Sequence, residues 1–297
     1  MCYPFTLVYP RGSTLRLDRV AEDIFIFVSD FYVQVTATVL ITPQGAIVID
    51  TMPLPSETRQ ILAFIEDRVG PNAVRYVINS HHHADHVYGN YLFAGAEIIA
   101  HDICRDTLAR LGPSSLEQAK RNVPALAEVE LRLPDITFQK ELHLHLGHRH
   151  LRLFHTPGHT PDGISVFVVE EKVLIAGDAV MPVPHIVSGN YLQLSDSLAA
   201  IKALKPAFIV QGHGDVLLRG EIDEELEGSI NYLSTIVKRV NQVIQRGDPP
   251  QKLRDIDIES CGKSRIPLDG LVSRLHLDNL VSLYKALSQE KEKLRQR

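Results

Sequence analysis

The stretch NSHHHADH (residues 79–86) follows an apolar, β-branched run and is followed within three residues by a glycine. Its four histidines and one aspartate fall within six positions. Imidazole nitrogens and carboxylate oxygens are ligands that zinc takes in proteins, usually with at least three protein groups at a catalytic ion. The candidate ligands in this stretch are His81, His83, Asp85 and His86. Four groups so close in sequence cannot all reach one ion, but they suit two adjacent ions with further ligands from elsewhere.

Three further candidates share one local context, an apolar strand-like run that ends in a turn of small residues. FHTPGHT supplies His159, VLIAGD supplies Asp178 and FIVQGHG supplies His213. A glycine beside each of them lets the backbone turn tightly, so that a short side chain at the end of a strand can point into a shared cleft. We therefore expect the three segments to complete the site that the histidine cluster begins.

The pattern His81-x-His83-x-Asp85-His86, followed by His159, Asp178 and His213 in that order, resembles the metallo-β-lactamase-fold hydrolases. The resemblance extends from about residue 20 to residue 220. It implies an α/β fold, a four-layer αβ/βα sandwich with a C-terminal helical extension. We expect residues 1–220 to form the catalytic domain and residues 221–297 to form helices packed on the same domain.

The resemblance also implies a ligand set. His81, His83 and His159 would hold a first ion, Asp85, His86 and His213 would hold a second, and Asp178 would bridge the two. Asp50 matches an early aspartate of the family and is expected to contact the ligands rather than the ions. Two Zn²⁺ are the expected cofactors, and iron or manganese also suits mixed histidine and carboxylate sites.

The activity that follows is that of a dinuclear metallo-hydrolase acting on a small molecule. Zinc lowers the pKa of a bound water from about 15.7 to about 7, so a hydroxide bridged by two ions is available at neutral pH. It would cleave an ester, thioester, lactone or amide-type bond, with Asp85 as the candidate catalytic residue that orients it. The alternatives are a mononuclear iron persulfide dioxygenase of the same fold and a non-enzymatic zinc-binding protein. Structural zinc sites are closed and have four ligands, which fits seven candidates poorly.

Differences between branches of the family narrow the substrate. The main zinc β-lactamases carry cysteine where Asp178 stands, which argues against antibiotic hydrolysis as the main role. TPGHTPDG and AGDAV resemble glyoxalase II, although its glutathione-binding basic residues are not recognisable in the C-terminal helices. The closest general match is a group of uncharacterised or accessory zinc hydrolases.

Composition excludes other classes of partner. The 297 residues are 44% hydrophobic and 23% charged, with a formal net charge of −5 and no cluster of basic residues for nucleic acid. No apolar run approaches the ~20 residues that cross a membrane. The N-terminus lacks a secretory signal pattern, and three widely spaced cysteines predict no disulfide framework. We expect a cytoplasmic protein, and the sequence leaves its oligomeric state open.

Several local structures are also predicted. Residues 23–29 and 33–42 should form a hairpin with Phe31 and Tyr32 at its tip. Helices are expected from a cap at Ser56 to about residue 69, over 101–111 and 115–128, over about 194–204, and from a cap at Asp278. Aromatic side chains at such a tip either pack on the core or form a wall for a bound molecule. We expect Phe31 and Tyr32 to line an apolar cleft over the metals, with residues 179–191 as its facing wall. Within that wall His185, like His155 elsewhere, is a weaker candidate for contacting ligands or substrate.

Overall fold

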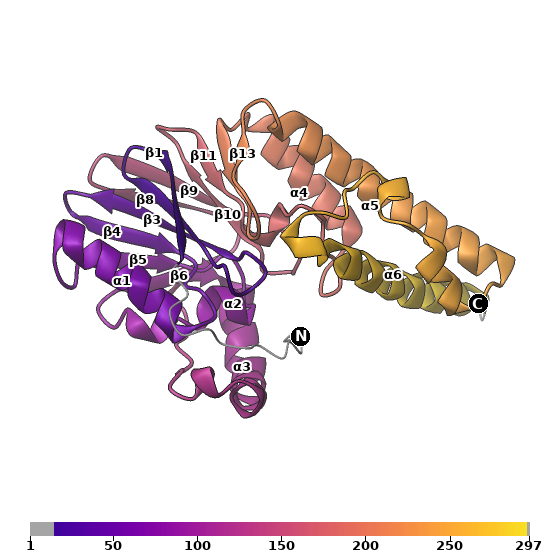
Figure 1. Cartoon of the computed structure of the whole chain (residues 1–297), viewed down its shortest axis with the longest axis horizontal. Helices are drawn as coiled ribbons and strands as arrows, with labels where there is room; N and C mark the ends of the chain where they lie inside the picture. The colour runs from indigo at the N-terminus through magenta and orange to yellow at the C-terminus, as the bar shows by residue number, and fades with distance from the viewer. Residues whose placement is uncertain (1–14, 296–297) are drawn as a thin grey trace.

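The computed structural model describes residues 15–295 and contains two mixed β-sheets packed face to face with helices outside them (Figure 1). The first sheet has the spatial order β1 (Arg16–Ala21), β2 (Ile24–Val28), β3 (Thr36–Thr42), β4 (Gly45–Ile49), β5 (Val74–Ile78), β6 (Glu97–His101) and β7 (Ile136–Phe138). The second has the order β13 (Leu217–Leu218), β12 (Phe208–Val210), β11 (Val173–Ile175), β10 (Ile164–Val168), β9 (Arg149–His155) and β8 (Glu141–Leu146). The predicted four-layer sandwich is confirmed.

The helices cover the two outer faces. α1 (Pro55–Val69) and α3 (Asp102–Asn122) pack on the first sheet, and α4 (Tyr191–Ala203) lies over the second. α5 (Ile222–Arg246) and α6 (Val272–Arg295) run side by side and extend away from the sandwich. The remaining short elements are α2 (Ala84–Val87), η1 (Asn90–Leu92), η2 (Pro124–Leu126), η3 (Gly177–Ala179), η4 (Pro250–Asp255), η5 (Glu259–Cys261) and η6 (Leu268–Gly270).

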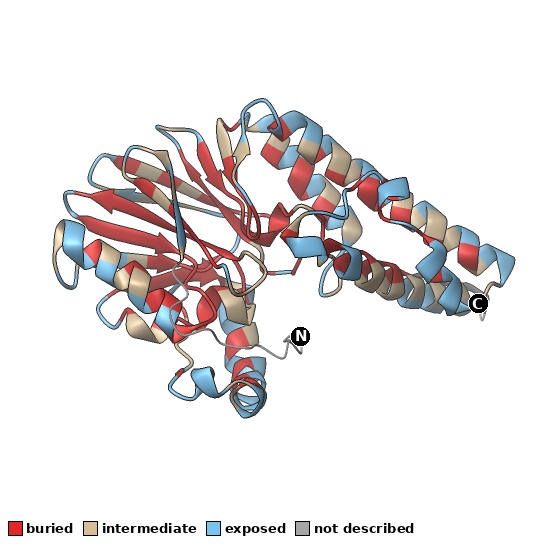
Figure 2. Ribbon diagram, in the orientation of Figure 1, coloured by how far each residue is buried: buried red, intermediate tan, exposed pale blue. Residues whose placement is uncertain are grey.

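The core between the sheets follows from the two-residue period of the strands. Ile24, Ile26 and Val28 point inward from β2, and Leu151 and Leu153 meet them from β9. Figure 2 shows the buried residues concentrated on the strands of both sheets. β4, β5, β6 and β7 are parallel neighbours, as are β11 and β12. The carboxyl ends of β5, β11 and β12 carry the turns that hold the candidate site.

Three predicted helix boundaries were wrong. Ser56 lies inside α1, whose first residue is Pro55, a position where the missing N–H of proline costs nothing. The helices expected at 101–111 and 115–128 are one helix, because its buried face continues on both sides of Pro113. Asp278 lies inside α6, which begins at Val272, and the buried residues Val272 and Leu275 precede the predicted cap.

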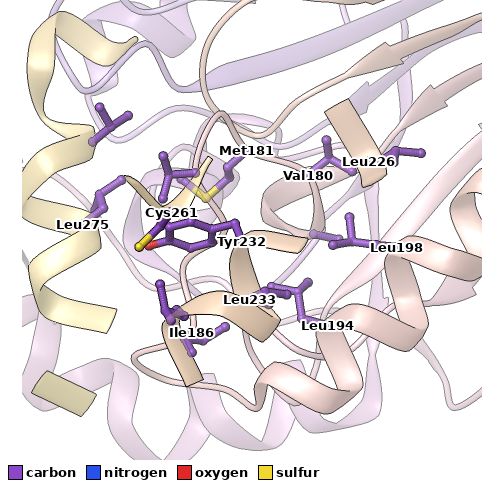
Figure 3. Close-up of a cluster of buried hydrophobic side chains, with 14 of the residues drawn as sticks. Val180, Met181, Ile186, Leu194, Leu198, Leu226, Tyr232, Leu233, Cys261 and Leu275 are labelled. Carbon is purple, nitrogen blue, oxygen red and sulfur yellow. The ribbon is translucent and has the colours of Figure 1, made fainter. Parts of the chain in front are cut away.

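The C-terminal helices share a core with earlier parts of the chain. Leu226, Leu233 and Ile236 of α5 belong to the same buried cluster as Leu194 and Leu198 of α4 (Figure 3). The domain boundary at residue 220 stays a prediction. Among the described residues, no helix combines the length and apolar composition needed to cross a membrane.

Candidate metal centre

The structure brings all seven predicted ligands together at one edge of the sandwich. His81 and His83 lie on the turn after β5, and Asp85 and His86 lie in the short helix α2 that follows. The others come from the ends of the second sheet: His159 after β9, Asp178 in η3 after β11, and His213 after β12. Their ligand atoms form two groups, each compact enough to hold one ion.

The first group contains His81, His83, His159 and Asp178. His83 Nδ1 lies 2.9 Å from His81 Nε2 and 3.1 Å from His159 Nε2. Asp178 Oδ2 lies 3.2 Å from His159 Nε2 and 3.8 Å from His81 Nε2. A tetrahedral zinc with bonds of about 2.0–2.1 Å separates its ligand atoms by about 3.3 Å. The first group therefore has the dimensions of a tetrahedral site.

The second group contains Asp85, His86 and His213. Asp85 Oδ2 lies 3.3 Å from His213 Nε2 and 3.6 Å from His86 Nε2. Asp178 also reaches this group, because its Oδ1 lies 3.4 Å from His86 Nε2 and its Oδ2 lies 3.6 Å from His213 Nε2. The Asp178 carboxylate therefore lies between the two groups, where a bridging ligand would stand.

Two buried polar atoms of the centre lack a hydrogen bond. Among residues 15–295, His86 Nε2 and Asp178 Oδ1 have no hydrogen-bond partner. A buried polar atom without a partner is costly, so native proteins rarely contain one without a bound water or ion. These two atoms face each other across the centre, and coordination of a metal would satisfy both.

Hydrogen bonds to the far side of four imidazoles orient the ligand nitrogens. In each case Nδ1 faces an oxygen: Ser80 Oγ for His81, Asp50 Oδ2 for His86, the His185 carbonyl for His159 and the Val33 carbonyl for His213, at 3.0, 2.8, 2.7 and 2.9 Å. Carbonyl and carboxylate oxygens only accept, so Nδ1 donates and Nε2 is left with its lone pair for a metal.

Asp50 contacts ligand-bearing residues in the way expected of it. Its Oδ2 accepts from His86 Nδ1 and from Ser80 Oγ at 2.7 Å, and its Oδ1 accepts from Ser80 N at 2.7 Å. Ser80 Oγ donates to Asp50 and therefore accepts from His81 Nδ1. One buried carboxylate thus holds a ligand from each group, directly for His86 and through Ser80 for His81.

The electrostatics of the centre suit bound cations. Burial lowers the pKa of His81, His83 and His159, which keeps these imidazoles neutral. Burial alone would raise the pKa of Asp178, but His213, His86 and His159 outweigh it and hold the pKa well below its usual range.

Burial also opposes charge on His86, yet Asp50, Asp85 and Asp178 raise its pKa to about 9, and Asp178 and Asp85 raise that of His213. The carboxylates therefore favour positive charge at the centre, which divalent cations would supply.

Two other histidines, His82 and His155, form their hydrogen bonds with groups outside the seven candidate ligands. His82 turns away from the ligands, as predicted, and its N and Nδ1 each lie 2.8 Å from a carboxylate oxygen of Asp162. The His155 ring lies tilted against that of His101, with the ring centres 4.2 Å apart, and its Nε2 donates to the Pro161 carbonyl. The role of Asp162 was missed, although it forms part of the quoted TPGHTPD motif.

The prediction of a facing wall was wrong for its apolar side chains. Val180, Met181, Val183 and Ile186 are buried in the cluster beneath α4, α5 and α6, because the C-terminal helices cover them (Figure 3). Phe31 and Tyr32 lie at the tip of the β2–β3 hairpin, as predicted, but they are half-buried against two different core clusters. This packing favours a place in the core over a place in a cleft wall for both rings.

A family model supplies the deciding comparison. A family model with the description "Metallo-beta-lactamase superfamily" matches residues 31–213, and this range contains all seven residues of the two groups. The chain belongs to the metallo-beta-lactamase superfamily. The predicted resemblance is confirmed, and with it membership of a family of metal-dependent hydrolases.

The individual proteins that match this chain resemble it at low sequence identity. The hydroxyacylglutathione hydrolase of Pelagibacter ubique (strain HTCC1062) is 28% identical over 152 residues, 50% of this chain and 54% of that protein. The beta-lactamase-like protein 2 homolog of Caenorhabditis elegans is 26% identical over 230 residues, 77% of this chain and 70% of that protein. The chain thus spans about half the length of the first of these relatives.

Solved structures share the fold. The metallo-beta-lactamase from Pontibacter korlensis superposes with a TM-score of 0.60 at 18% identity, over 72% of this chain and 98% of that chain. DIM-1 metallo-beta-lactamase superposes with a TM-score of 0.56 at 19% identity, over 72% of this chain and 98% of that chain. At this identity the likeness concerns the fold alone.

Proposed function

We propose that the protein is a dinuclear zinc hydrolase that cleaves an ester, thioester, lactone or amide-type bond in a small molecule. The observation that carries the proposal is the Asp178 carboxylate, which lies between two ligand groups with Oδ1 buried and without a hydrogen bond. His81, His83 and His159 would hold one ion and Asp85, His86 and His213 the other, with Asp178 shared. The donor set of imidazoles and carboxylates suits zinc.

When bound, the two ions would lower the pKa of a water and polarise the bond to be cleaved. The residues of the chain supply the rest. Burial alone would raise the pKa of Asp85, but His86 and His213 outweigh it and keep the carboxylate ionised. Its side chain is more accessible than that of Asp178, 13% against 5% exposed. Asp85 can therefore accept a hydrogen bond from an attacking water and orient it.

The substrate class to test first is the thioester. One relative is named as a hydrolase of hydroxyacylglutathione, and it is 28% identical to this chain over 152 residues. The other classes are lactones, β-lactams, phosphodiesters and sulfate esters, which distinguish among the chemistries that one metal centre supports on this fold. A small-molecule substrate agrees with the net charge of −5 and the lack of a basic cluster.

The experiment combines elemental analysis with turnover of that panel. We expect two zinc ions per chain and hydrolysis of at least one class. His159→Ala should lose metal and activity, whereas His148→Ala, a matched change at an exposed histidine on the β8–β9 turn, should lose neither. A single tightly held ion in the presence of excess zinc would exclude the dinuclear centre. One iron per chain with oxygen uptake on a persulfide would favour the dioxygenase alternative.

A further inference from the structure

The orientation of His159 depends on one backbone carbonyl. His159 Nδ1 donates to the His185 carbonyl at 2.7 Å, and this bond turns Nε2 toward Asp178. The carbonyl lies in the loop 180–190, which joins η3 to α4. The loop is pressed against the turn that carries His159: Asn190 N donates to the Gly158 carbonyl, and a Cβ on Gly189 would lie 1.9 Å from the same oxygen.

The other side of that peptide unit is held by the C-terminal helix α6. Asn279 Oδ1 accepts from Ile186 N at 2.9 Å, and its Nδ2 donates to the Pro184 carbonyl at 2.6 Å. The Ile186 N–H and the His185 C=O belong to one peptide group, which is planar and, in a trans bond, points its N–H and C=O in opposite directions. Asn279 and His159 therefore form hydrogen bonds to opposite sides of the same rigid peptide group.

Asn279 is itself fixed by a buried network between α5 and α6. Its Nδ2 lies 3.3 Å from Tyr232 Oη, which donates to His276 Nδ1 at 2.8 Å. His276 Nε2 donates to the Ile256 carbonyl at 2.9 Å, so Nδ1 is the acceptor, and burial lowers the pKa of this imidazole and keeps it neutral. Tyr232 and Asn279 are fully buried, and Figure 3 shows Tyr232 in the same cluster as Ile186.

We propose that Asn279 is a positioning residue for His159, which it orients through the His185–Ile186 peptide plane. The C-terminal helices thereby hold a ligand of the first group although none of their own side chains belongs to either group. The inference rests on the proposed function, because it requires that His159 bind an ion. A residue that only stabilised the helical region would affect folding and leave the affinity for metal unchanged.

The test compares two neighbouring, fully buried positions of α6 in the full-length chain. Asn279→Leu keeps the size of the side chain and removes both bonds to the loop, whereas Leu280→Ala removes packing alone. Zn²⁺ affinity is measured by competition with a chromophoric chelator, and the Co²⁺-loaded protein gives a visible spectrum that reports the geometry of the ligands. Asn279→Leu should weaken Zn²⁺ binding by about 10- to 100-fold and alter the Co²⁺ spectrum. Leu280→Ala should lower Tm and change neither.

A second variant covers the case in which Asn279→Leu fails to fold. Asn279→Ser keeps a polar group in the helix, but its side chain is too short to reach Ile186 N, so it should weaken Zn²⁺ binding in the same direction. His159→Ala provides the reference for complete loss of the ligand. In a hydrolysis assay, the Asn279 variants should lower kcat more than they raise KM, because the metal rather than the substrate is displaced.

The outcomes separate the inference from the function beneath it. Wild-type affinity and an unchanged Co²⁺ spectrum in a folded Asn279 variant would overturn the positioning role, and so would an equal loss of affinity in Leu280→Ala. If His159→Ala loses metal in the same series, the proposed function stands. If His159→Ala binds metal like the wild type, both the proposed function and the inference fail.

Discussion

Asp50 Oδ2 accepts a hydrogen bond from His86 Nδ1 at 2.8 Å, and both side chains are buried. Asp50 adopts a φ of +61°, a left-handed conformation in which aspartate and asparagine are enriched among non-glycine residues. This strained position follows directly after β4 and brings the carboxylate beneath the ligand histidines. The backbone conformation thus serves the second ligand group.

Asp50→Asn should lower the affinity for the ion of the second group. It should not disturb the backbone, because asparagine tolerates the same φ. Loss of the carboxylate removes the largest of the contributions that raise the pKa of His86, and it makes the imidazole a weaker metal donor. We expect about 10- to 100-fold lower affinity for one of two zinc ions, measured by chelator competition. Unchanged affinity for both ions would exclude this role.

Asp178→Ala should weaken the binding of both ions, because its carboxylate contacts both ligand groups. The ion of the second group should lose the most affinity. Turnover should fall by about a thousand-fold or more, since a catalytic metal supplies several kcal/mol of transition-state stabilisation. Elemental analysis and the hydrolysis assay check this together. A variant with full activity would remove the bridging role from Asp178.

Gly212→Ala should displace Asp178 without changing a ligand. A Cβ at this position would lie 2.0 Å from Asp178 Oδ1 and 2.7 Å from the backbone carbon of Gly177, so the carboxylate or the backbone must move. Overpacking of this kind costs about 1–3 kcal/mol of stability. We expect lower zinc affinity and turnover together with a lower Tm.

Gly220→Ala is the matched control for that substitution, because a Cβ there has no neighbour within 4 Å. It should leave metal content, turnover and Tm unchanged. Equal behaviour of the two variants would show that the close approach of Gly212 to Asp178 is not required for the centre.

The sequence predicted which side chains gather at the candidate centre better than it predicted what orients them. Each of the seven is an imidazole or carboxylate at or just after the end of an apolar run, a pattern visible in the letters themselves. The carbonyls of Val33 and His185 orient two of these ligands, and a backbone carbonyl has no sequence signature. The apolar run after Asp178 suits a cleft wall and a buried core equally well. Only the packing of α5 and α6, which are distant in sequence, decides for the core.

Glu57→Gln should change how stability depends on pH. Glu57 is buried in the first turn of α1, where burial raises its pKa to about 7 although Ser29 Oγ donates to it at 2.6 Å. Between pH about 4.5 and 7 the folded chain holds this proton and the unfolded chain has released it. Stability from this group is therefore fully present below about pH 4.5 and is lost as pH rises to about 7.

The wild type should lose at most about 3 kcal/mol of its free energy of unfolding in this way. The variant should not, because glutamine carries no titratable proton. Urea unfolding of both proteins at pH 5 and pH 8 measures it, because the difference between them cancels the pH dependence that they share. The variant should gain stability relative to the wild type at pH 8. An equal difference at both pH values would place the ionised form of Glu57 in the folded state throughout.

Phe31→Ala and Tyr32→Ala decide whether the hairpin tip belongs to the core or to a cleft. Ser29 Oγ accepts from Phe31 N at 3.1 Å and from Tyr32 N at 2.9 Å, which fixes the backbone of the tip. Both rings are half-buried, Tyr32 on the cluster beneath α1 and Phe31 on the cluster beneath α3. Each truncation should therefore cost about 1.5–2.5 kcal/mol of stability, half the cost at a fully buried phenylalanine.

Because the rings pack against the core, KM for the best substrate and the metal content should stay close to wild-type values in both variants. Ile266→Ala is the control, since its side chain is 78% exposed and contributes little to packing. A raised KM with unchanged Tm and metal content would reverse this assignment. The two aromatics would then form the substrate wall expected from the sequence, and their contacts with the core clusters would serve to hold that wall in place.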